Sequence, residues 1–160
     1  MNNIRIGIGY DVHRLVEGEA FWLGGVRVHH HKGAIGHSDA DVLIHAICDA
    51  LLGAANLGDI GIHFPDDDPS LKGIDSKILL KKVAGLLASE GWAISNVDSV
   101  VSLQMPKIKP YISDMKKTLA EVMNMNPETV SVKATTTEKL GFIGREEGVE
   151  ARAVVLIHEA

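Results

Sequence analysis

The chain has 160 residues, a length that suits a single domain over residues 1–160, and 46% of them are hydrophobic, enough to bury a core. Only 4% are aromatic, so that core must be built from aliphatic and small side chains. The net charge of −5, without any lysine- and arginine-rich run, argues against a nucleic-acid partner, and no apolar run approaches the roughly 20 residues of a membrane span.

The N-terminal part of the chain predicts two strands. Residues 4–12 alternate apolar with small or polar side chains, which is typical of a strand, and no signal-peptide core precedes them. Residues 21–28 form a second candidate strand with a bulge expected at Gly24 and Gly25, and residues 29–33 form a polar turn. The one cysteine, Cys48, excludes an intramolecular disulfide, so we expect a cytoplasmic protein.

Two helices are predicted next along the chain. We expect Ser38 to cap a helix over residues 39–56, with Asp41 three residues later in an acidic variant of the capping box. A second amphipathic helix covers residues 75–90 and ends at Gly91. Its expected buried side consists of Ile78, Leu79, Val83, Leu86 and Leu87.

The second half of the chain predicts three further strands and one helix. The strands cover residues 97–103, 129–135 and 149–158, and the helix covers residues 112–123. The resulting order, β-β-α-α-β-α-β-β, predicts an α/β fold: a single-layer mixed β-sheet with helices on one face. Because the strands near residues 94–103 and 149–157 carry apolar side chains on both faces, we expect a partner subunit to cover the other face.

Three residues form a candidate metal site. Asp11 and His13 lie two residues apart at the end of a predicted strand, so their side chains point to the same face. This pair is half of a zinc-type site, or else a polar strand end with a solvated histidine. His45 lies off the apolar stripe of its helix and completes an Asp/His/His set. Three protein ligands leave one position for water or substrate, as in catalytic zinc sites.

Two neighbours of His45 on the same helix bear on this site. Asp49, four residues on, is placed to hold the second imidazole nitrogen as an outer partner. Cys48, three residues on, is a rival metal ligand. A lone cysteine on a helix is more often a small buried hydrophobe, and we favour that interpretation.

Four other segments suit an anionic ligand or a cation. Residues 36–39 supply backbone N–H groups at a helix start, as an anion site or as plain capping. Asp59 lies between two glycines, in a carboxylate-presenting loop or a simple turn. Residues 66–68 are three aspartates, which bind a divalent ion or are only solvated. Residues 133–145 offer three threonines to phosphate oxygens, and Glu138 to a hard cation such as magnesium.

Taken together, these segments resemble the 2-C-methyl-D-erythritol 2,4-cyclodiphosphate synthase family. The resemblance spans roughly residues 4 to 157, with the motifs in the same order. The matching segments are Gly9–His13, Gly36–Asp41 with His45, Leu51–Ala54, Gly58–Gly61, Phe64–Asp66 and Lys133–Arg145.

The resemblance implies an activity and roles for individual residues. The substrate would be 4-diphosphocytidyl-2-C-methyl-D-erythritol 2-phosphate, whose 2-phosphate attacks its own β-phosphorus and releases CMP. Asp11, His13 and His45 would hold one Zn²⁺ per subunit, and Glu138 would hold Mg²⁺ or Mn²⁺ at the diphosphate. His37 and Thr136 would stabilise the transition state.

The same resemblance implies a substrate-binding set. Asp59 and residues 64–68 would meet the methylerythritol portion, and residues 103–109 with 135–138 would cradle the cytidine and its phosphates. The full set is Asp11, Val12, His13, His37, Ser38, Asp59, Ile60, Gly61, Phe64, Pro65, Asp66, Asp67, Asp68, Leu103, Gln104, Met105, Pro106, Lys107, Ile108, Lys109, Thr135, Thr136, Thr137, Glu138, Phe142 and Arg145.

The resemblance also implies a homotrimer with its active sites between subunits. Arg145 and Glu147 would face an axial cavity, where an isoprenoid diphosphate is a possible ligand. Two other classes of function remain open from the residues alone. One is a metal-dependent phosphohydrolase or pyrophosphatase that uses the same ligands, and the other is a noncatalytic trimeric ligand-binding module of similar fold.

Overall fold

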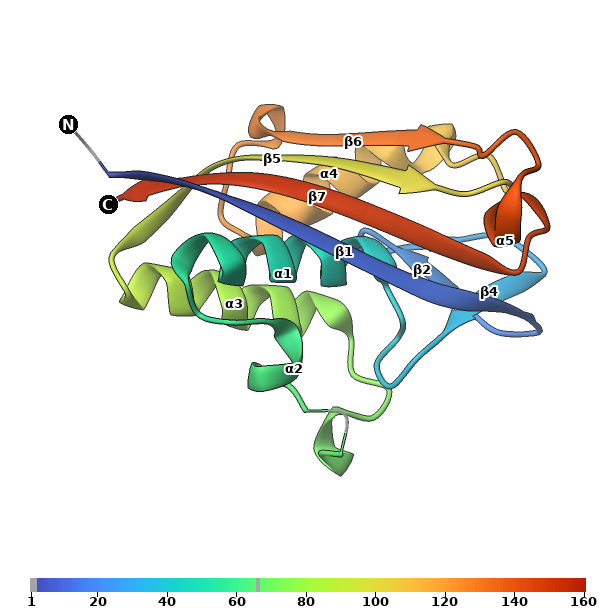
Figure 1. Ribbon diagram of the computed structural model, residues 1–160, viewed down its shortest axis with the longest axis horizontal. Coiled ribbons are helices and arrows are strands. Elements are labelled where there is room, and N and C mark those ends of the chain that lie inside the picture. The colour runs from blue at the N-terminus through green and yellow to red at the C-terminus, as the bar shows by residue number, and fades with distance from the viewer. Residues whose placement is uncertain (1–2, 66) are drawn as a thin grey trace.

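The computed structural model of the chain describes residues 3–65 and 67–160. A five-stranded sheet forms its centre, and Figure 1 shows the strands lying side by side. The strand order is β4-β1-β7-β5-β6, and β2 pairs with β3 in a separate hairpin. The strands are β1 (Ile4–Glu17), β2 (Phe21–Leu23), β3 (Val26–Val28), β4 (Lys32–Ile35), β5 (Trp92–Ser102), β6 (Val130–Thr135) and β7 (Gly148–Glu159).

The sheet is mixed, as predicted. Strand β1 runs antiparallel to both β4 and β7, and β5 runs antiparallel to β7. Among the strands of the described residues, only β5 and β6 pair in parallel. The chain connects these two strands through a helix, because parallel neighbours need a crossover connection.

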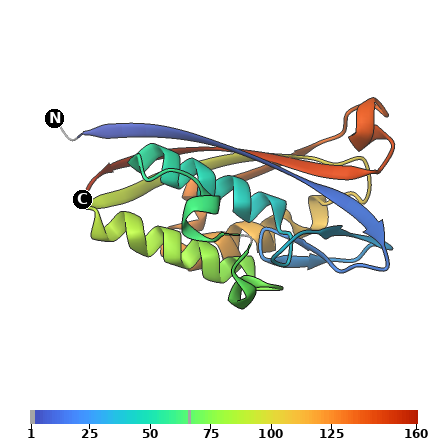
Figure 2. The ribbon, with the colours of Figure 1, turned by 60° about the horizontal axis from the view of Figure 1, so that its bottom comes forward.

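Helices cover one face of the sheet. The helices are α1 (Val42–Ala55), α2 (Ile60–His63), α3 (Ser76–Ser89), α4 (Ile112–Val122) and α5 (Gly141–Gly144), with 3-10 turns η1 (Pro69–Leu71), η2 (Lys109–Tyr111) and η3 (Pro127–Thr129). Of these, α1, α3 and α4 pack on this face, whereas α5 lies at the end of β7 (Figure 2). Figure 2 shows α1 and α3 on the same side of the sheet, with β1 and β7 passing over them. The predicted single-layer sheet with helices on one face is confirmed. No helix in the described part of the chain is both long and apolar enough to cross a membrane.

Helix α1 lies directly on β1 because β1 carries glycine where the two meet. A Cβ added to Gly7 would lie 1.9 Å from the carbonyl oxygen of Ala50, and one added to Gly9 would lie 1.9 Å from that of Ala46. Only glycine leaves room for so close an approach. Most of α1 is buried, and the surrounding core is aliphatic, as the composition predicts.

The prediction of one strand over residues 21–28 is wrong. Gly24 and Gly25 have φ values of 58° and 76°, and they form the two-residue turn of the β2–β3 hairpin instead of a bulge. Two adjacent residues with positive φ are typical of such tight hairpin turns. The predicted polar turn over residues 29–33 is too long, because Lys32 and Gly33 belong to β4.

The prediction that Ser38 caps α1 is also wrong. Asp41 is the N-cap, and its carboxylate accepts hydrogen bonds from the backbone N–H groups of Ile44, Gly24 and Gly25. Burial raises the pKa of this carboxyl group, and the three N–H groups lower it again in part. Asp41 therefore fastens the β2–β3 turn to the start of α1.

Helix α3 has nearly the predicted bounds, but its buried side differs from the prediction. Ile78 is 46% exposed, whereas Leu80 is fully buried. The buried residues of α3 are Ser76, Leu79, Leu80, Val83 and Leu87. The buried side of α3 is therefore rotated away from Ile78. The first residue of the helix, Ser76, is also buried.

Candidate active site

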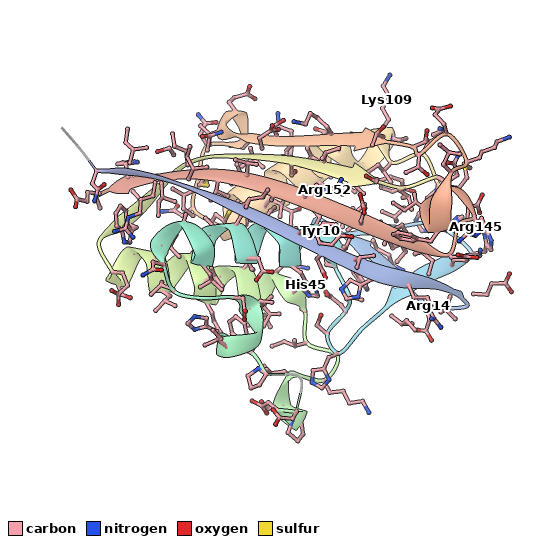
Figure 3. All side chains as sticks on the ribbon, in the orientation of Figure 1. Tyr10, Arg14, His45, Lys109, Arg145 and Arg152 are labelled. Carbon is pink, nitrogen blue, oxygen red and sulfur yellow. The ribbon has the colours of Figure 1, made fainter. Side chains whose placement is uncertain are left out.

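The three predicted metal ligands meet at one point. Asp11 and His13 come from β1, and they lie within ligand distance of His45 on α1. Figure 3 shows His45 between α1 and β1. The Oδ2 atom of Asp11 lies 2.9 Å from His13 Nε2 and 3.0 Å from His45 Nδ1, and the two ring nitrogens are 3.1 Å apart. Strand parity and the close packing of α1 on β1 together produce this cluster.

The geometry of this cluster suits a metal ion. Ligand bonds of about 2.0–2.1 Å in a tetrahedral site place the ligand atoms about 3.3 Å apart. The observed separations of 2.9, 3.0 and 3.1 Å are only a few tenths of an ångström shorter. A small outward shift of the three side chains therefore makes room for an ion, and one carboxylate with two imidazoles is a ligand set typical of zinc.

The outer nitrogen of each histidine has a partner. His13 Nδ1 donates to the carbonyl oxygen of Ile35 at 3.1 Å, because a carbonyl group can only accept. This leaves Nε2 of His13 free to act as a ligand. His45 Nε2 lies 3.0 Å from the hydroxyl oxygens of both Ser38 and Ser76. Outer partners of this kind orient a metal-binding imidazole.

The outer partner predicted for His45 is wrong. The Asp49 carboxylate accepts the backbone N–H of Ile60 at 2.8 Å, which is the N–H that begins α2. The hydroxyl of Ser76 contacts Nε2 of His45 in the position predicted for the Asp49 carboxylate. The sequence did not point to Ser76. Its only signal in the sequence is its position directly after Asp75 at a helix start, where a serine is ordinarily read as part of a cap.

Charges within the cluster stabilise one another. Burial alone would raise the pKa of Asp11, but hydrogen bonds from His13 and His45 outweigh it and hold that pKa below its ordinary value. Burial alone would lower the pKa of His45, but Asp11 raises it above its ordinary value.

Cys48 is fully buried in the core, where burial raises the pKa of its thiol. The interpretation of Cys48 as a small buried hydrophobe is confirmed.

A cavity of about 340 Å³ opens beside the cluster. It is lined by the ligands Asp11, His13 and His45 together with Gly36, His37, Ser38, Asp49, Ile60, Gly61, Phe64, Leu71, Ile74 and Leu79. The structure therefore brings five of the other predicted substrate-binding residues to the metal ligands: His37, Ser38, Ile60, Gly61 and Phe64. The ring of His37 is fixed by a contact of 3.1 Å between its Nε2 atom and the carbonyl oxygen of Asp68.

Several other residues predicted to bind the substrate do not line this cavity. Val12 points to the opposite face of the sheet and is 42% exposed. Asp59 caps α2 by accepting from the N–H of Ile62, and Asp68 accepts from the N–H and the hydroxyl of Ser70. Pro65 and Asp67 are exposed, and Asp66 lies outside the described residues.

The predicted nucleotide-binding segments form a second, separate hollow. Leu103, Pro106, Lys107, Ile108, Ala134, Thr135 and Thr136 line a space of about 120 Å³. Within the described residues, this lining and that of the metal-site cavity have no residue in common. The chain thus carries two separate hollows, each lined by part of the predicted site.

The predicted cation ligand lies at the rim of this second hollow. Thr136 Oγ1 donates to the Glu138 carboxylate at 3.1 Å, and Glu138 adopts the left-handed conformation with φ of 53°. Thr137 donates its hydroxyl to the carbonyl oxygen of Leu140. Gln104 accepts from the N–H of Lys139, which joins the two predicted nucleotide segments. Met105 is 40% exposed and Lys109 begins η2.

Arg145 and Phe142 lie at the end of the sheet, next to β7. The Arg145 guanidinium makes a two-pronged pair with Glu147, with contacts of 3.0 and 2.9 Å. Phe142 lines a shallow hollow with Val12, His13, Arg14, Glu147 and Gly148. Figure 3 shows Arg145 at the same end of the molecule as Arg14, away from His45. Neither residue lines the metal-site cavity.

Comparison with known proteins finds relatives that match nearly the whole chain. The 2-C-methyl-D-erythritol 2,4-cyclodiphosphate synthase of Bacteroides fragilis is 59% identical over 155 residues, which cover 97% of this chain and 98% of the relative. The IspF protein of Plasmodium falciparum, solved as a CDP complex, is 36% identical with a TM-score of 0.86, and the match covers 99% of this chain and 98% of that one.

A third similar protein is longer than this chain. The bifunctional IspDF protein of Campylobacter jejuni is 41% identical with a TM-score of 0.96 over 100% of this chain. The chain spans 43% of the length of that protein. A sequence model described as the YgbB family matches residues 4–158. With nearly its whole length matched, the chain belongs to the YgbB family.

Proposed function

We propose that the chain converts 4-diphosphocytidyl-2-C-methyl-D-erythritol 2-phosphate into 2-C-methyl-D-erythritol 2,4-cyclodiphosphate and CMP, a step of non-mevalonate isoprenoid biosynthesis. An oxygen of the 2-phosphate bonds to the β-phosphorus, and the bond from that phosphorus to the CMP oxygen breaks. The observation that carries this proposal is the Asp11–His13–His45 cluster beside a cavity, in a chain 59% identical to a synthase of that name.

The arrangement suits a reaction whose nucleophile belongs to the substrate. The enzyme then has to fold the substrate for in-line attack and to offset charge, which is how phosphoryl transfer is usually catalysed. A Zn²⁺ ion at the cluster and a Mg²⁺ or Mn²⁺ ion at Glu138 would supply positive charge at the phosphate oxygens. We assign His37 and Thr136 to transition-state stabilisation, because His37 lines the cavity beside the metal ligands and Thr136 lines the second hollow.

The two hollows lie apart within one chain, and this separation supports an assembly in which a neighbouring chain completes each active site. Each hollow would then be a half-site of that assembly. One hollow carries the metal ligands and the other carries the proposed nucleotide segments. The sheet face opposite the helices is apolar along β1, where Ile6 is 71% and Ile8 is 72% exposed. Exposed apolar residues in a row are typical of an interface. We therefore propose a homotrimer packed through these faces, with Arg145 near an axial cavity that can hold an isoprenoid diphosphate.

The state of the one cysteine supports a proposal on the compartment. The free Cys48 is buried in the core, which suits a reducing environment, and we propose that the enzyme works in the cytoplasm.

The test is to supply the cytidyl substrate and to follow its phosphorus atoms by ³¹P NMR. CMP together with a cyclic diphosphate is the expected result. CMP with ring-free phosphates would instead indicate a phosphohydrolase, and binding without turnover would indicate a noncatalytic module. The His45→Ala variant is the control, because it removes a proposed metal ligand and should yield neither product.

A further inference from the structure

The first residue of α3 contacts a proposed metal ligand on α1. The hydroxyl oxygen of Ser76 lies 3.0 Å from Nε2 of His45, although the two residues are 31 positions apart. Ser76 is fully buried. Its hydroxyl also contacts the Asp39 carboxylate, and its backbone N–H donates to Oδ2 of the same carboxylate at 3.0 Å. Three groups from separate segments therefore form a chain: His45, Ser76 and Asp39.

The direction of the hydrogen bonds in this chain follows from what each group can donate. A carboxylate at neutral pH can only accept, so the hydroxyl proton of Ser76 points to Asp39. The oxygen of Ser76 then faces His45 as an acceptor, and Nε2 of His45 must carry the proton that it accepts. In the neutral imidazole that would bind a metal ion the other nitrogen is then unprotonated, whereas in the metal-free protein that nitrogen can carry a second proton donated to Asp11. That nitrogen, Nδ1, is the atom that faces Asp11 and His13.

The second hydroxyl near His45 differs from Ser76 in its surroundings. Ser38 Oγ also lies 3.0 Å from Nε2, but its other contacts are the N–H of Ala40 at 3.2 Å and the Ser76 hydroxyl at 3.3 Å. The Ala40 N–H and the protonated Nε2 can only donate, so among these contacts the Ser38 proton can go only to the Ser76 oxygen, whereas the proton of Ser76 is held by a carboxylate.

The backbone fixes the distance between Asp39 and Ser76. The N–H of Asp39 donates to the carbonyl oxygen of Ile74 at 3.0 Å, and the N–H of Gly73 donates to that of His37 at 2.7 Å. These two bonds join the segment before α1 to the segment before α3. The carboxylate and the hydroxyl are thus brought together by backbone pairing and do not depend on a bound ion.

We propose that Ser76 and Asp39 are positioning residues that act as one unit on His45. They hold its ring with Nδ1 turned toward Asp11 and His13, and so they set the metal affinity of the cluster. The inference rests on the proposed metal centre and extends it to two residues outside the ligand set. Neither residue lines the metal-site cavity, so the main effect of each is expected on metal binding before turnover begins.

The test measures zinc affinity by competition with a chromophoric chelator, without substrate. Ser76→Ala should weaken zinc binding by about 10–100-fold, which is the usual loss when an outer partner of a metal ligand is removed. Asp39→Asn should weaken it in the same direction. Because the two residues act in series, the double variant should bind zinc about as well as Ser76→Ala alone. The Co²⁺-substituted protein should show a shifted visible spectrum in both single variants.

Ser38→Ala is the matched control, because it removes a hydroxyl at the same distance from Nε2 and should cost less affinity. Melting of the metal-free variants separates positioning from a structural role. If Ser76→Ala lowers the melting temperature of the metal-free protein but leaves zinc affinity unchanged, the inference is overturned. Additive losses in the double variant, or equal losses in Ser38→Ala and Ser76→Ala, also overturn it. If the unmodified protein binds no zinc, the proposed metal centre itself fails, whatever the CMP assay shows.

Discussion

A side-chain carbon on Gly9 would lie 1.9 Å from the carbonyl oxygen of Ala46. Gly9 lies two residues before Asp11, and Ala46 directly follows His45. The contact that sets the spacing of β1 and α1 therefore also sets the spacing of two proposed metal ligands. Packing and the proposed metal binding depend on the same short stretch of backbone.

Replacing Gly9 by alanine should destabilise the fold and spread the metal ligands apart. Overpacking typically costs about 1–3 kcal/mol, and a clash with backbone belongs at or above the upper end of that range. Urea unfolding measures the free energy change, and metal analysis measures zinc retention. Gly53→Ala is the control, because an added Cβ there meets nothing within 4 Å on an exposed position of α1. It should be neutral or stabilise by up to about 1 kcal/mol. Equal stability of the two variants would contradict the packing argument.

Replacing His45 by alanine should remove the bound metal and leave the fold intact. The cluster lies at the rim of a cavity, and the aliphatic core does not depend on it. Elemental analysis after dialysis gives the metal content, and circular dichroism reports the fold. Cys48→Ala should keep full metal content, since the thiol is buried with a raised pKa. Zinc loss in the cysteine variant would restore Cys48 as the rival ligand.

The metal-free protein should lose stability as pH rises above neutrality. The folded state raises the pKa of His45, so its contribution is complete below the ordinary histidine value of about 6.5 and disappears as pH passes the raised pKa. The lowered pKa of Asp11 adds a contribution that is present above about pH 4 and is lost as pH falls further.

Urea unfolding of the metal-free protein at several pH values tests this dependence. The free energy of unfolding should be largest between about pH 4 and 6.5. A His45→Gln variant should show a shallower decline on the alkaline side, because it has no imidazole to titrate. An identical decline in both proteins would assign the pH dependence to other groups.

Glu138→Gln should weaken the magnesium dependence of turnover without releasing zinc. The substitution keeps the shape of the side chain and its contact with Thr136 but removes the negative charge. Turnover measured against magnesium concentration should need more metal and reach a lower maximum. An unchanged magnesium response would mean that Glu138 does not hold the magnesium ion and acts only as the acceptor of the Thr136 hydroxyl.

A mixture of two inactive variants tests the shared active site. His45→Ala disables the metal half-site, and Thr136→Ala disables the other hollow. After subunit exchange, some interfaces pair two intact halves, so part of the activity should return. Sedimentation as a monomer, or no recovery after exchange has been verified by mass spectrometry, would refute the proposed assembly.

The ligand set was predictable because each member depends on local geometry. Strand alternation alone places Asp11 and His13 on one face, and the helical pattern alone removes His45 from the apolar stripe. Their meeting also needs the close contact at Gly9, whose only trace in the sequence is the repeated glycine of β1.

The outer partner of His45 was predicted wrongly because helical spacing identifies neighbours only on the same helix. Asp49 has the right spacing, but the N–H of Ile60 occupies its carboxylate. Ser76 reaches His45 from another helix, and single-sequence periodicity carries no information on such a pairing. The hairpin turn was missed for a related reason, since two glycines within an apolar run fit a bulge or a turn equally well.

The hydrogen bonds of Asp41 decide where extra residues can be inserted into the chain. The tip of a β-hairpin is ordinarily a good place to insert a tag or a foreign loop, because little depends on it. Here both turn N–H groups donate to the buried Asp41 carboxylate. An insertion between Gly24 and Gly25 would leave that carboxylate short of donors inside the protein and would loosen the start of α1. The turn at Gly18, where an added Cβ meets nothing within 4 Å, is the better site for an insertion.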